Sequence, residues 1–173
     1  FKAIYLEVDF SSDGSSYPIS LLDLNGFRPI QFIQILQEPG ILQYFPPTTF
    51  TLEKTLRYIN HQTTHWQEHG YGHWAVTLKE GGGVIGWNGL EYLPETDENE
   101  VAYLLSHQAW GCGYATEAAA PAIKFGFEKA GLKSIIGLVH PGNAGSIRVL
   151  EKCGLAFVDR KVYWGLEMCR YRI

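Results

Sequence analysis

A group of glycines follows a short apolar run in the middle of the chain. Gln108, Gly111 and Gly113 have the spacing Gln-x-x-Gly-x-Gly, and the apolar run before them extends from Val101 to Leu105. Glycines let the backbone bend sharply and expose consecutive N–H groups. The residues that begin at Tyr114 predict a helix, whose unpaired N-terminal amides favour an anion. A buried strand, a glycine turn and a helix N-terminus together predict a binding site for a pyrophosphate.

The glycine turn differs from two familiar nucleotide motifs. A dinucleotide fingerprint needs a third glycine, but Thr116 occupies that position, and no Gly-Lys-Ser/Thr follows for a nucleoside-triphosphate loop. A coenzyme A site is the closest remaining kind. Taken alone, a Gly-x-Gly pair is also typical of an ordinary turn between a strand and a helix, so the surrounding sequence must decide.

A second polar segment lies about thirty residues further along the chain. It begins with Asn143 and Ser146, continues as Ile-Arg-Val-Leu-Glu-Lys-Cys and ends at Gly154. Asn143 predicts the cap of a short helix that Gly154 closes. The two segments, in this order, resemble the GNAT superfamily of acyl-CoA-dependent N-acyltransferases. The phrase Gly-Tyr-Ala-Thr-Glu-Ala and the block Asn-x-x-Ser followed by Glu-Lys-x-Gly are similar to its RimJ/RimL branch.

The resemblance implies a site for acetyl-CoA. In this family the central strand and its parallel neighbour splay apart, and the pantetheine arm inserts between them like an added strand. The acyl carbonyl then faces a backbone N–H near the end of the central strand. The residues implied to contact acetyl-CoA are Leu104, Leu105, Gln108, Trp110, Gly111, Cys112, Gly113, Tyr114, Ala115, Thr116, Asn143 and Ser146. No metal is expected.

Acetyl transfer to an amine needs a base, because a protonated amine cannot attack a thioester. Glu100 is the candidate, since it opens the central strand and matches the Glu-Ile-Gly-Tyr pattern of RimJ/RimL-like proteins as Glu-Val-Ala-Tyr. The alternative is a solvated carboxylate at the end of a strand. Glu95, Asp97 and Glu98 crowd the same loop, and neighbouring carboxylates are expected to raise the pKa of Glu100.

The departing thiolate needs a hydrogen-bond donor. Many GNAT enzymes use a tyrosine seven residues after the motif asparagine, but this chain has Leu150 there. The resemblance to the RimJ/RimL block implies that Ser146 takes this place. A thiolate with a pKa near that of cysteine hardly needs full protonation, so Ser146 is assigned a hydrogen-bonding role.

The whole chain has the composition of a globular protein. Its 173 residues predict a single domain, residues 1–173, and the formal charge of −4 gives no support to nucleic acid or an anionic membrane as partner. No apolar run approaches the roughly 18 residues of a membrane span. We therefore expect a cytoplasmic enzyme, monomeric or homodimeric, whose partners are acetyl-CoA and an amine acceptor.

The pattern of elements predicts an α+β (mixed α/β) fold of GNAT type. Its central mixed sheet is mostly antiparallel, is flanked by helices and contains a splayed parallel strand pair. A hairpin is predicted over residues 2–24, helices over 25–37, 51–69, 114–130 and 144–153, and strands over 74–78, 84–90, 101–105, 134–139, 156–164 and 166–173. The apolar faces of the helices are expected at Phe27, Ile30, Ile33 and Leu36, at Leu52, Leu56 and Ile59, and at Ala119, Ile123 and Phe127.

Two residue classes allow other chemistry. Cys112, Cys153 and Cys169 are an odd number at wide spacing, which fits neither a disulfide framework nor a zinc site, so all three are expected to be reduced. Cys112 lies in the glycine turn. Its side chain is either a nucleophile or a small group that is tolerated where the backbone approaches a ligand. Histidines recur every four residues near the end of the second helix, but no carboxylate or cysteine follows at motif spacing, which favours a polar helix face over zinc. They are His61, His65 and His69, with His73 after them.

The sequence leaves the acceptor open. The second helix, the loop Tyr44 to Pro47 and the strand around Trp87 are expected to line its pocket, and their aromatic residues favour a flat or apolar group beside the amine. The resemblance implies an α-amine, on a protein N-terminus or on a small molecule. The alternative function is a GNAT-like acyl-CoA-binding or sensor module without catalysis.

Overall fold

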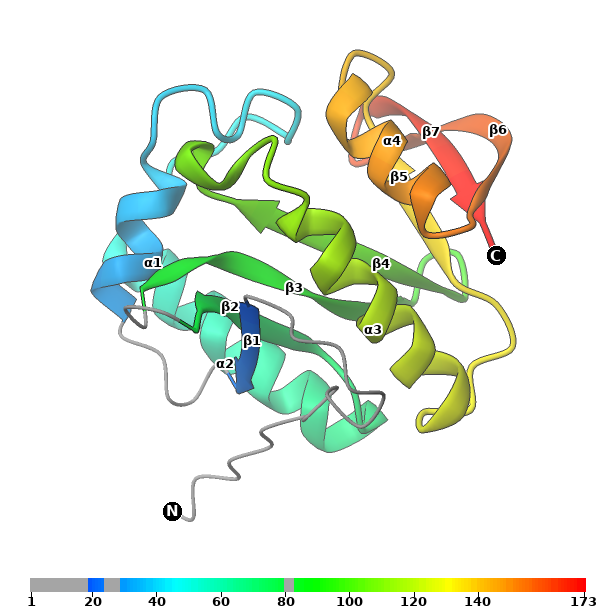
Figure 1. Cartoon of the computed structure of the whole chain (residues 1–173), viewed down its shortest axis with the longest axis horizontal. Helices are drawn as coiled ribbons and strands as arrows, with labels where there is room; N and C mark the ends of the chain where they lie inside the picture. The colour runs from blue at the N-terminus through cyan, green and yellow to red at the C-terminus, as the bar shows by residue number, and fades with distance from the viewer. Residues whose placement is uncertain (1–18, 24–28, 80–82) are drawn as a thin grey trace.

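The computed structural model describes residues 19–23, 29–79 and 83–173 (Figure 1). In this part of the chain seven strands form one sheet in the order β1-β2-β3-β4-β5-β7-β6. Neighbouring strands are antiparallel, except for the parallel pair of β4 and β5. The strands are β1 (Ile19–Asp23), β2 (His73–Leu78), β3 (Val84–Leu93), β4 (Glu98–Leu105), β5 (Ile136–Val139), β6 (Ala156–Tyr163) and β7 (Leu166–Arg172). The predicted mixed, mostly antiparallel sheet is confirmed.

The parallel pair of β4 and β5 is joined at one end only. Its single register pair is Glu100 with Ile136, although β4 continues to Leu105 and β5 to Val139. Antiparallel neighbours hold the outer edges of both strands, as β3 pairs with β4 along its whole length and β7 pairs with β5. The sheet therefore opens between β4 and β5, as predicted.

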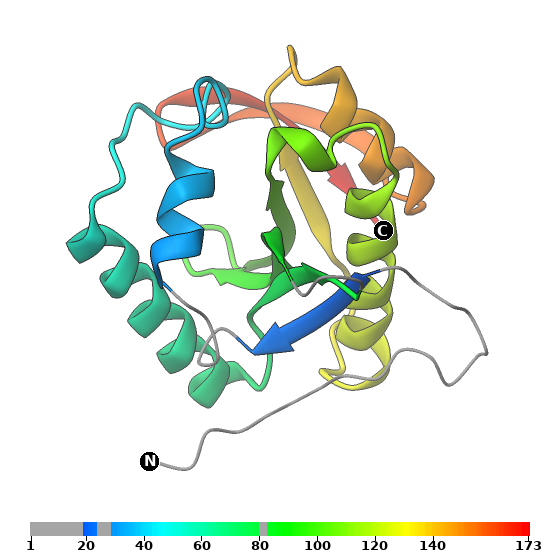
Figure 2. The same cartoon turned by 60° about the vertical axis from the view of Figure 1, so that its left-hand side comes forward.

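Four helices of the described residues cover the sheet on two sides. Figure 2 shows α1 and α2 on one side of the strands and α3 and α4 on the other. Their bounds are α1 (Pro29–Leu36), α2 (Leu52–His69), α3 (Tyr114–Glu128) and α4 (Ala144–Lys152). The predicted caps are confirmed, since Thr51 accepts a hydrogen bond from the Lys54 N–H and Asn143 accepts one from the Ser146 N–H.

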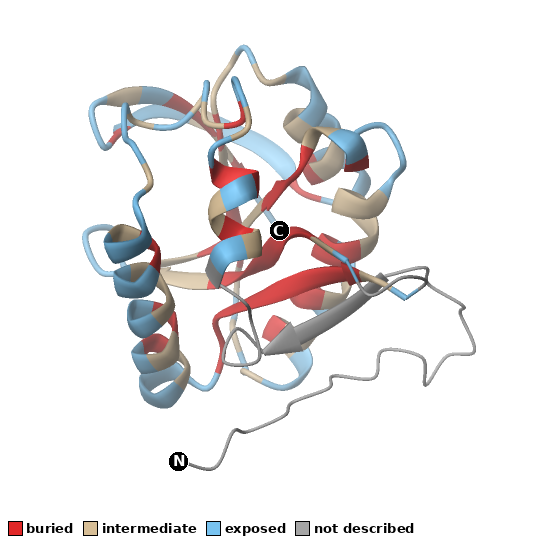
Figure 3. Ribbon diagram, turned by 90° about the vertical axis from the view of Figure 1, so that its left-hand side faces the viewer, coloured by how far each residue is buried: buried red, intermediate tan, exposed pale blue. Residues whose placement is uncertain are grey.

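Each side of the sheet has its own apolar core. Under α3, Val101 of β4 packs with Ala119, Ile123 and Leu150. Under α1, Leu104 of β4 packs with Trp87 of β3 and with helix residues Phe32, Ile35 and Leu36. Figure 3 shows the buried residues along the central strands and on the inner surfaces of the helices. Because successive residues of a strand point to opposite faces, β4 contributes to both cores.

The predicted apolar face of α1 is confirmed at Leu36 but wrong at Ile30, and that of α2 is wrong at Leu52 and Leu56. Ile30 of α1 is 68% exposed, and on α2 Leu52 and Leu56 are 53% and 44% exposed. The buried positions of α2 are instead polar: Thr55, Gln62 and His65. Hydrogen bonds to the sheet compensate their burial, because Gln62 accepts from the His73 N–H and His65 accepts from the Tyr92 N–H. On α3, Ala119 and Ile123 are buried as predicted, whereas Phe127 is half-buried.

Several predictions fall on residues outside those that the structure describes. They are the first strand of the hairpin over residues 2–24, its turn, and the start of the first helix at Asn25 and Phe27. Within the predicted hairpin, Ile19–Asp23 forms β1 and pairs with β2. No helix of the described residues is long and apolar enough to cross a membrane.

Candidate active site

The glycine turn after β4 has the backbone that the sequence predicts. Gly111 and Gly113 have φ angles of +75° and +85°, in the left-handed region that favours glycine. No atom lies within 4 Å of the position that a Cβ would take at either residue, so open space adjoins the turn. Helix α3 begins at Tyr114, and no side chain caps it. The turn and the first helical turn therefore offer N–H groups to an anion.

The backbone N–H groups of this turn are available for a ligand. Within the described residues, no hydrogen bond is formed by the N–H of Gly111, Cys112 or Gly113. The first intrahelical bond of α3 is donated by the Glu117 N–H to the Gly113 carbonyl, so the N–H groups before it lack a helical acceptor. This arrangement fits a pyrophosphate, because consecutive amides at a helix N-terminus bind phosphate oxygens.

One long-range contact and one local contact hold the turn in place, and neither was predicted from the sequence. The Glu38 carboxylate, just after α1, accepts hydrogen bonds from the Ser106 hydroxyl at 2.6 Å and from the His107 N–H at 2.8 Å. The Trp110 indole N–H donates to the Leu105 carbonyl at 2.7 Å. The turn is thus fastened to the end of β4 and to the segment after α1.

The residues expected to contact acetyl-CoA lie in one continuous region. The turn residues Gln108, Trp110, Gly111, Cys112 and Gly113 are exposed, and Tyr114, Ala115 and Thr116 are half-buried on the first turn of α3. Leu104 and Leu105 have buried side chains, so only their backbone can meet a ligand. They lie at the end of β4 that is not paired with β5.

Ser146 lies on the α3–α4 side of the sheet, beside Tyr103, the tyrosine of the Glu-Val-Ala-Tyr pattern, for which the sequence predicted no role at the site. The Tyr103 hydroxyl is 2.8 Å from the Ser146 hydroxyl and also donates to the Ser146 carbonyl at 3.1 Å. Burial raises the pKa of Tyr103, so its hydroxyl remains protonated. Leu150, where many GNAT enzymes have tyrosine, is buried in the core. A phenol therefore reaches the motif serine from β4 instead of from α4.

Glu100 is buried, with only 7% of its surface exposed. Burial raises its pKa to about 8, and the charge of Glu91, its partner across β3 and β4, adds to the increase. The Leu138 N–H of β5 donates to its carboxylate at 3.3 Å and acts in the opposite direction. The expected cause was wrong, because Glu95 and Asp97 are exposed and Glu98 binds Arg170. The alternative of a solvated carboxylate is also wrong.

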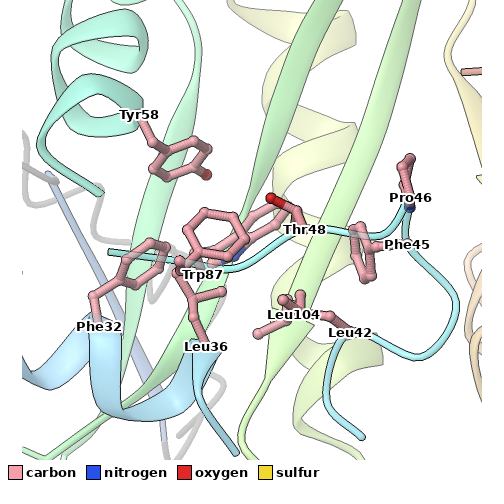
Figure 4. A pocket seen from close by; sticks show the side chains of 10 residues that line it. Phe32, Leu36, Leu42, Phe45, Pro46, Thr48, Tyr58, Trp87 and Leu104 are labelled. Atoms are coloured by element: carbon pink, nitrogen blue, oxygen red, sulfur yellow. The ribbon is translucent and has the colours of Figure 1, made fainter. Parts of the chain in front are cut away.

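An apolar pocket of about 190 Å³ lies on the side of the sheet that carries α1 and α2 (Figure 4). Trp87 of β3 and Leu104 of β4 form its inner wall, and Tyr58 of α2 lies beside them. Its remaining lining residues are Phe32, Leu36, Leu42, Phe45, Pro46, Thr48 and Phe50. The predicted contributions of the second helix, the loop around Phe45 and the strand around Trp87 all line it.

Glu100 is on the pocket's side of the sheet but is not part of its lining. Residues 100, 102 and 104 of β4 share one face, and Leu104 belongs to the pocket. The backbone from Glu100 to Leu104 spans roughly 14 Å. Ser146 approaches from the opposite face through its contact with Tyr103. The two predicted catalytic residues thus lie on opposite faces of the sheet, with Glu100 at the end of β4 that is paired with β5.

These features were compared with known proteins. The family profile described as acetyltransferase (GNAT) domain matches residues 20–156. The chain belongs to the GNAT family of N-acetyltransferases. An N-acetyltransferase called p20 from Bacillus licheniformis, named as uncharacterized, is 30% identical over 123 residues, which cover 68% of this chain and 67% of that protein.

Solved structures share the fold of this GNAT enzyme. An acetyltransferase from Agrobacterium tumefaciens has a TM-score of 0.77 at 24% identity and covers 100% of this chain and 95% of its own. Spermidine N-acetyltransferase from Vibrio cholerae, in complex with CoA and spermine, has a TM-score of 0.74 at 17% identity, with coverage of 90% and 95%. GNAT enzymes use acetyl-CoA, and the glycine turn of this chain has the backbone for it.

A buried polar cluster on α2 and the sheet was missed by the sequence analysis. Tyr58 and the His73 Nδ1 atom are 2.6 Å apart, and the His73 Nε2 atom is 3.6 Å from the Glu91 carboxylate. Burial lowers the pKa of His73 to about 4, so the ring is neutral at pH 7. Exposed His61 lies 3.0 Å from the other Glu91 oxygen. The contacts join residues 15 to 30 positions apart, which sequence spacing does not indicate.

The histidines and cysteines of the GNAT enzyme were considered as metal ligands and as nucleophiles, and their contacts bear on both roles. In the described residues, no group of three or more His, Cys, Asp or Glu side chains is placed to hold a metal ion. Both ring nitrogens of His65 are engaged, one with the Tyr71 carbonyl and one with the Tyr92 N–H. Cys112, Cys153 and Cys169 are free thiols. Burial raises the pKa of Cys153 to about 11, which makes it a poor nucleophile.

Proposed function

We propose that this GNAT enzyme transfers the acetyl group of acetyl-CoA directly to a primary amine while both substrates are bound. The carrying observation is the position of Glu100, a buried carboxylate with a pKa of about 8, on the face of β4 opposite Ser146. Beyond Glu100 the two strands separate toward Leu105, so two substrates can meet at this opening from the two faces of the sheet. We further propose that residues 1–173 act as one GNAT domain of the RimJ/RimL-like branch.

In this proposal acetyl-CoA supplies an acetyl group activated as a thioester. The N–H groups from Gly111 to Thr116 hold its pyrophosphate, together with the neighbouring residues Gln108 and Trp110. The unpaired end of β4, at Leu104 and Leu105, aligns the pantetheine arm and offers backbone N–H groups to the acyl oxygen. Asn143 orders the first turn of α4 and thereby positions Ser146.

Glu100 accepts the proton that the amine must lose. A base is most useful when its pKa lies near the working pH, and a pKa of about 8 is close to that of an α-amine. Because Glu100 is not part of the pocket lining, a chain of water molecules carries the proton between the amine and its carboxylate. This match supports α-amines over lysine side chains, whose unperturbed pKa is about 10.4.

Ser146 donates a hydrogen bond to the sulfur that leaves the acetyl group. The Tyr103 hydroxyl lies 2.8 Å from the serine hydroxyl and holds it in place, and either oxygen can be the donor of this contact. The serine hydrogen can therefore turn to the ligand when Tyr103 donates to the serine oxygen. Tyr103 itself is a weak proton donor, because burial raises its pKa. The hydrogen bond stabilises negative charge on sulfur without full proton transfer.

The first test measures the melting temperature with and without coenzyme A. Coenzyme A is expected to raise it, and Gly111→Val should abolish the increase, because a valine at φ +75° distorts the turn. Gly165→Val is the matched control, since Gly165 has φ +81° and equally open surroundings but lies in the turn between β6 and β7. Equal increases in both variants would place the ligand elsewhere.

A turnover assay then separates the enzyme from a binding module without catalysis. Acetyl-CoA is incubated with a short peptide that carries both an α-amine and a lysine side chain, and mass spectrometry locates the label. We expect label on the α-amine. Label mainly on lysine would contradict the acceptor assignment. Binding of coenzyme A without transfer to any amine would favour the binding module.

A further inference from the structure

On the basis of the proposed function, we infer that the acceptor amine carries an uncharged, apolar side group, and that this group occupies the pocket of Figure 4. The pocket lies on the same side of the sheet as Glu100, and Leu104 connects it to the unpaired end of β4. A side group in the pocket leaves the amine at the opening between β4 and β5, where the acetyl group is expected.

The lining of the pocket is apolar almost throughout. Aromatic and aliphatic side chains form its floor and walls, and Figure 4 shows Phe32, Leu36 and Trp87 directed toward one another across it. No charged side chain of the described residues lines the pocket. A cationic side group placed there would lose its hydration without gaining a counter-charge, which costs far more than burial of a methyl group.

The hydroxyl groups of the lining give a polar side group little compensation. The Tyr58 hydroxyl is already hydrogen-bonded to the His73 Nδ1 atom at 2.6 Å, and the tautomer of the ring sets which of the two donates. Thr48 lies at the exposed rim, where the Lys54 ammonium approaches its hydroxyl at 3.5 Å. A positive charge at the rim further disfavours a cationic side group.

The loop that forms the outer wall is attached to the segment before α4. Tyr44 donates a hydrogen bond to the Gly142 carbonyl at 3.0 Å and stacks on His140 at 5.1 Å. Gly142 immediately precedes the Asn143 cap that positions Ser146. The pocket therefore adjoins both parts of the proposed transfer site, β4 on one side and the N-terminus of α4 on the other.

The deciding experiment uses norleucine amide and ornithine amide, two acceptors of equal length. Both carry the same α-amine, and their side chains differ only in a terminal methyl group against a terminal ammonium. With saturating acetyl-CoA, we expect kcat/KM for α-acetylation to be about 100-fold higher for norleucine amide. Phenylalanine amide, with its flat apolar side group, should also have a much higher kcat/KM than ornithine amide.

A change of charge in the pocket should reverse this preference. Leu42→Asp places a carboxylate in the lining and is expected to reduce the ratio at least tenfold, by lowering the rate with norleucine amide and raising it with ornithine amide. Phe45→Asp repeats the test at a position that is 40% exposed, where folding tolerates a charge. Leu56→Asp is the matched control on the exposed surface of α2 and should leave the ratio unchanged.

The outcomes separate this inference from the proposed function. Equal or better use of ornithine amide by the wild-type enzyme would overturn the apolar acceptor alone, since transfer itself would have occurred. An unchanged ratio in both pocket variants would likewise place the side group elsewhere. No transfer to either amide or to the peptide would overturn the proposed function, and the acceptor class with it.

Discussion

Glu98 and Glu100 are two residues apart on β4 and point to the same side of the sheet, yet their surroundings differ. Glu98 binds the Arg170 guanidinium at 2.5 Å and accepts from the Tyr163 hydroxyl at 3.2 Å. Arg170 also binds the Asp159 carboxylate with two hydrogen bonds, at 2.9 and 2.8 Å. Glu100 is paired with no cation of the described residues and accepts from the Leu138 N–H.

The comparison separates two kinds of charged group. The ion pairs of Arg170 with Glu98 and Asp159 are a fixed charge, and the carboxyl of Glu100 is a variable charge. An arginine stays protonated at any physiological pH, and its hydrogen bonds to Asp159 lower the pKa of that carboxyl. Without such a partner, burial favours the neutral form and raises the pKa of Glu100 to about 8. The first arrangement contributes to stability, and the second makes a group that changes its protonation near neutral pH.

The largest effect is expected when the fixed charge loses its partner. Arg170→Met leaves the largely buried Glu98 and the partly exposed Asp159 without their cation, and it should destabilise the protein by more than the loss of an exposed ion pair does. Chemical denaturation at pH 7 measures the loss. The difference from wild type should shrink as the pH falls through the lowered pKa of Asp159, because a protonated carboxyl no longer needs the cation.

Arg160→Met provides the control for this effect. Arg160 binds Glu167 at 3.3 Å, but both side chains are more than half exposed, so the change should cost less than about 1 kcal/mol. Similar losses in the two variants would show that burial does not decide the strength of these ion pairs.

Glu100→Gln removes the variable charge. We expect turnover near pH 8 to fall about 100-fold while coenzyme A binding stays unchanged. Wild-type activity should rise with pH through about 8, as Glu100 becomes ionised, and this inflection should disappear in the variant. Glu95→Gln is the control, because Glu95 is an exposed carboxylate in the loop before β4, and this variant should keep the turnover and pH profile of the wild type. An unchanged pH profile in Glu100→Gln would remove Glu100 as the base.

The same variant also has a stability signature. Because the folded pKa of Glu100 is raised from 4.5 to about 8, the neutral group supports folding fully below pH 4.5, and this contribution is lost as the pH rises toward 8. Glu100→Gln should therefore melt above wild type at pH 9, with a smaller difference at pH 5. A constant difference across this range would contradict the raised pKa.

The smallest expected effect concerns the second cause of that raised pKa. Glu91→Gln removes the negative charge beside Glu100 and should move the inflection of the activity profile to lower pH, but only in part, because burial is the larger cause and remains. His61→Gln is the control, because it removes the exposed partner of Glu91 and keeps the Glu91 charge. An inflection that stays in place would assign the whole increase to burial.

The sequence was sufficient where a signal is local. The caps at Thr51 and Asn143, the glycine turn and the helix after it depend on neighbouring residues, and each is confirmed. The burial of polar residues on α2 was not predictable. Gln62 and His65 are buried because they bind backbone N–H groups of β2 and β3, which lie far away in the sequence.

Long-range contacts account for the rest of what was missed at the site. Tyr103 meets Ser146 across 43 residues, and Glu38 meets Ser106 across 68. The burial of Glu100 depends on packing of the strands, so a sequence in which carboxylates crowd one loop suggested the wrong cause for its raised pKa. Residue types identified the chemistry here, and tertiary packing determined how each group is tuned.

The Tyr44 contact gives the enzyme a thermodynamic link between its two substrates. The hydroxyl joins the wall of the acceptor pocket to the Gly142 carbonyl, next to the segment proposed to hold acetyl-CoA. If occupancy of the pocket strengthens this contact, the first substrate raises the affinity for the second, and reciprocity requires the same factor in the other direction. The strength of the coupling between the two substrates would then depend on one hydrogen bond, made by a tyrosine outside the pocket lining.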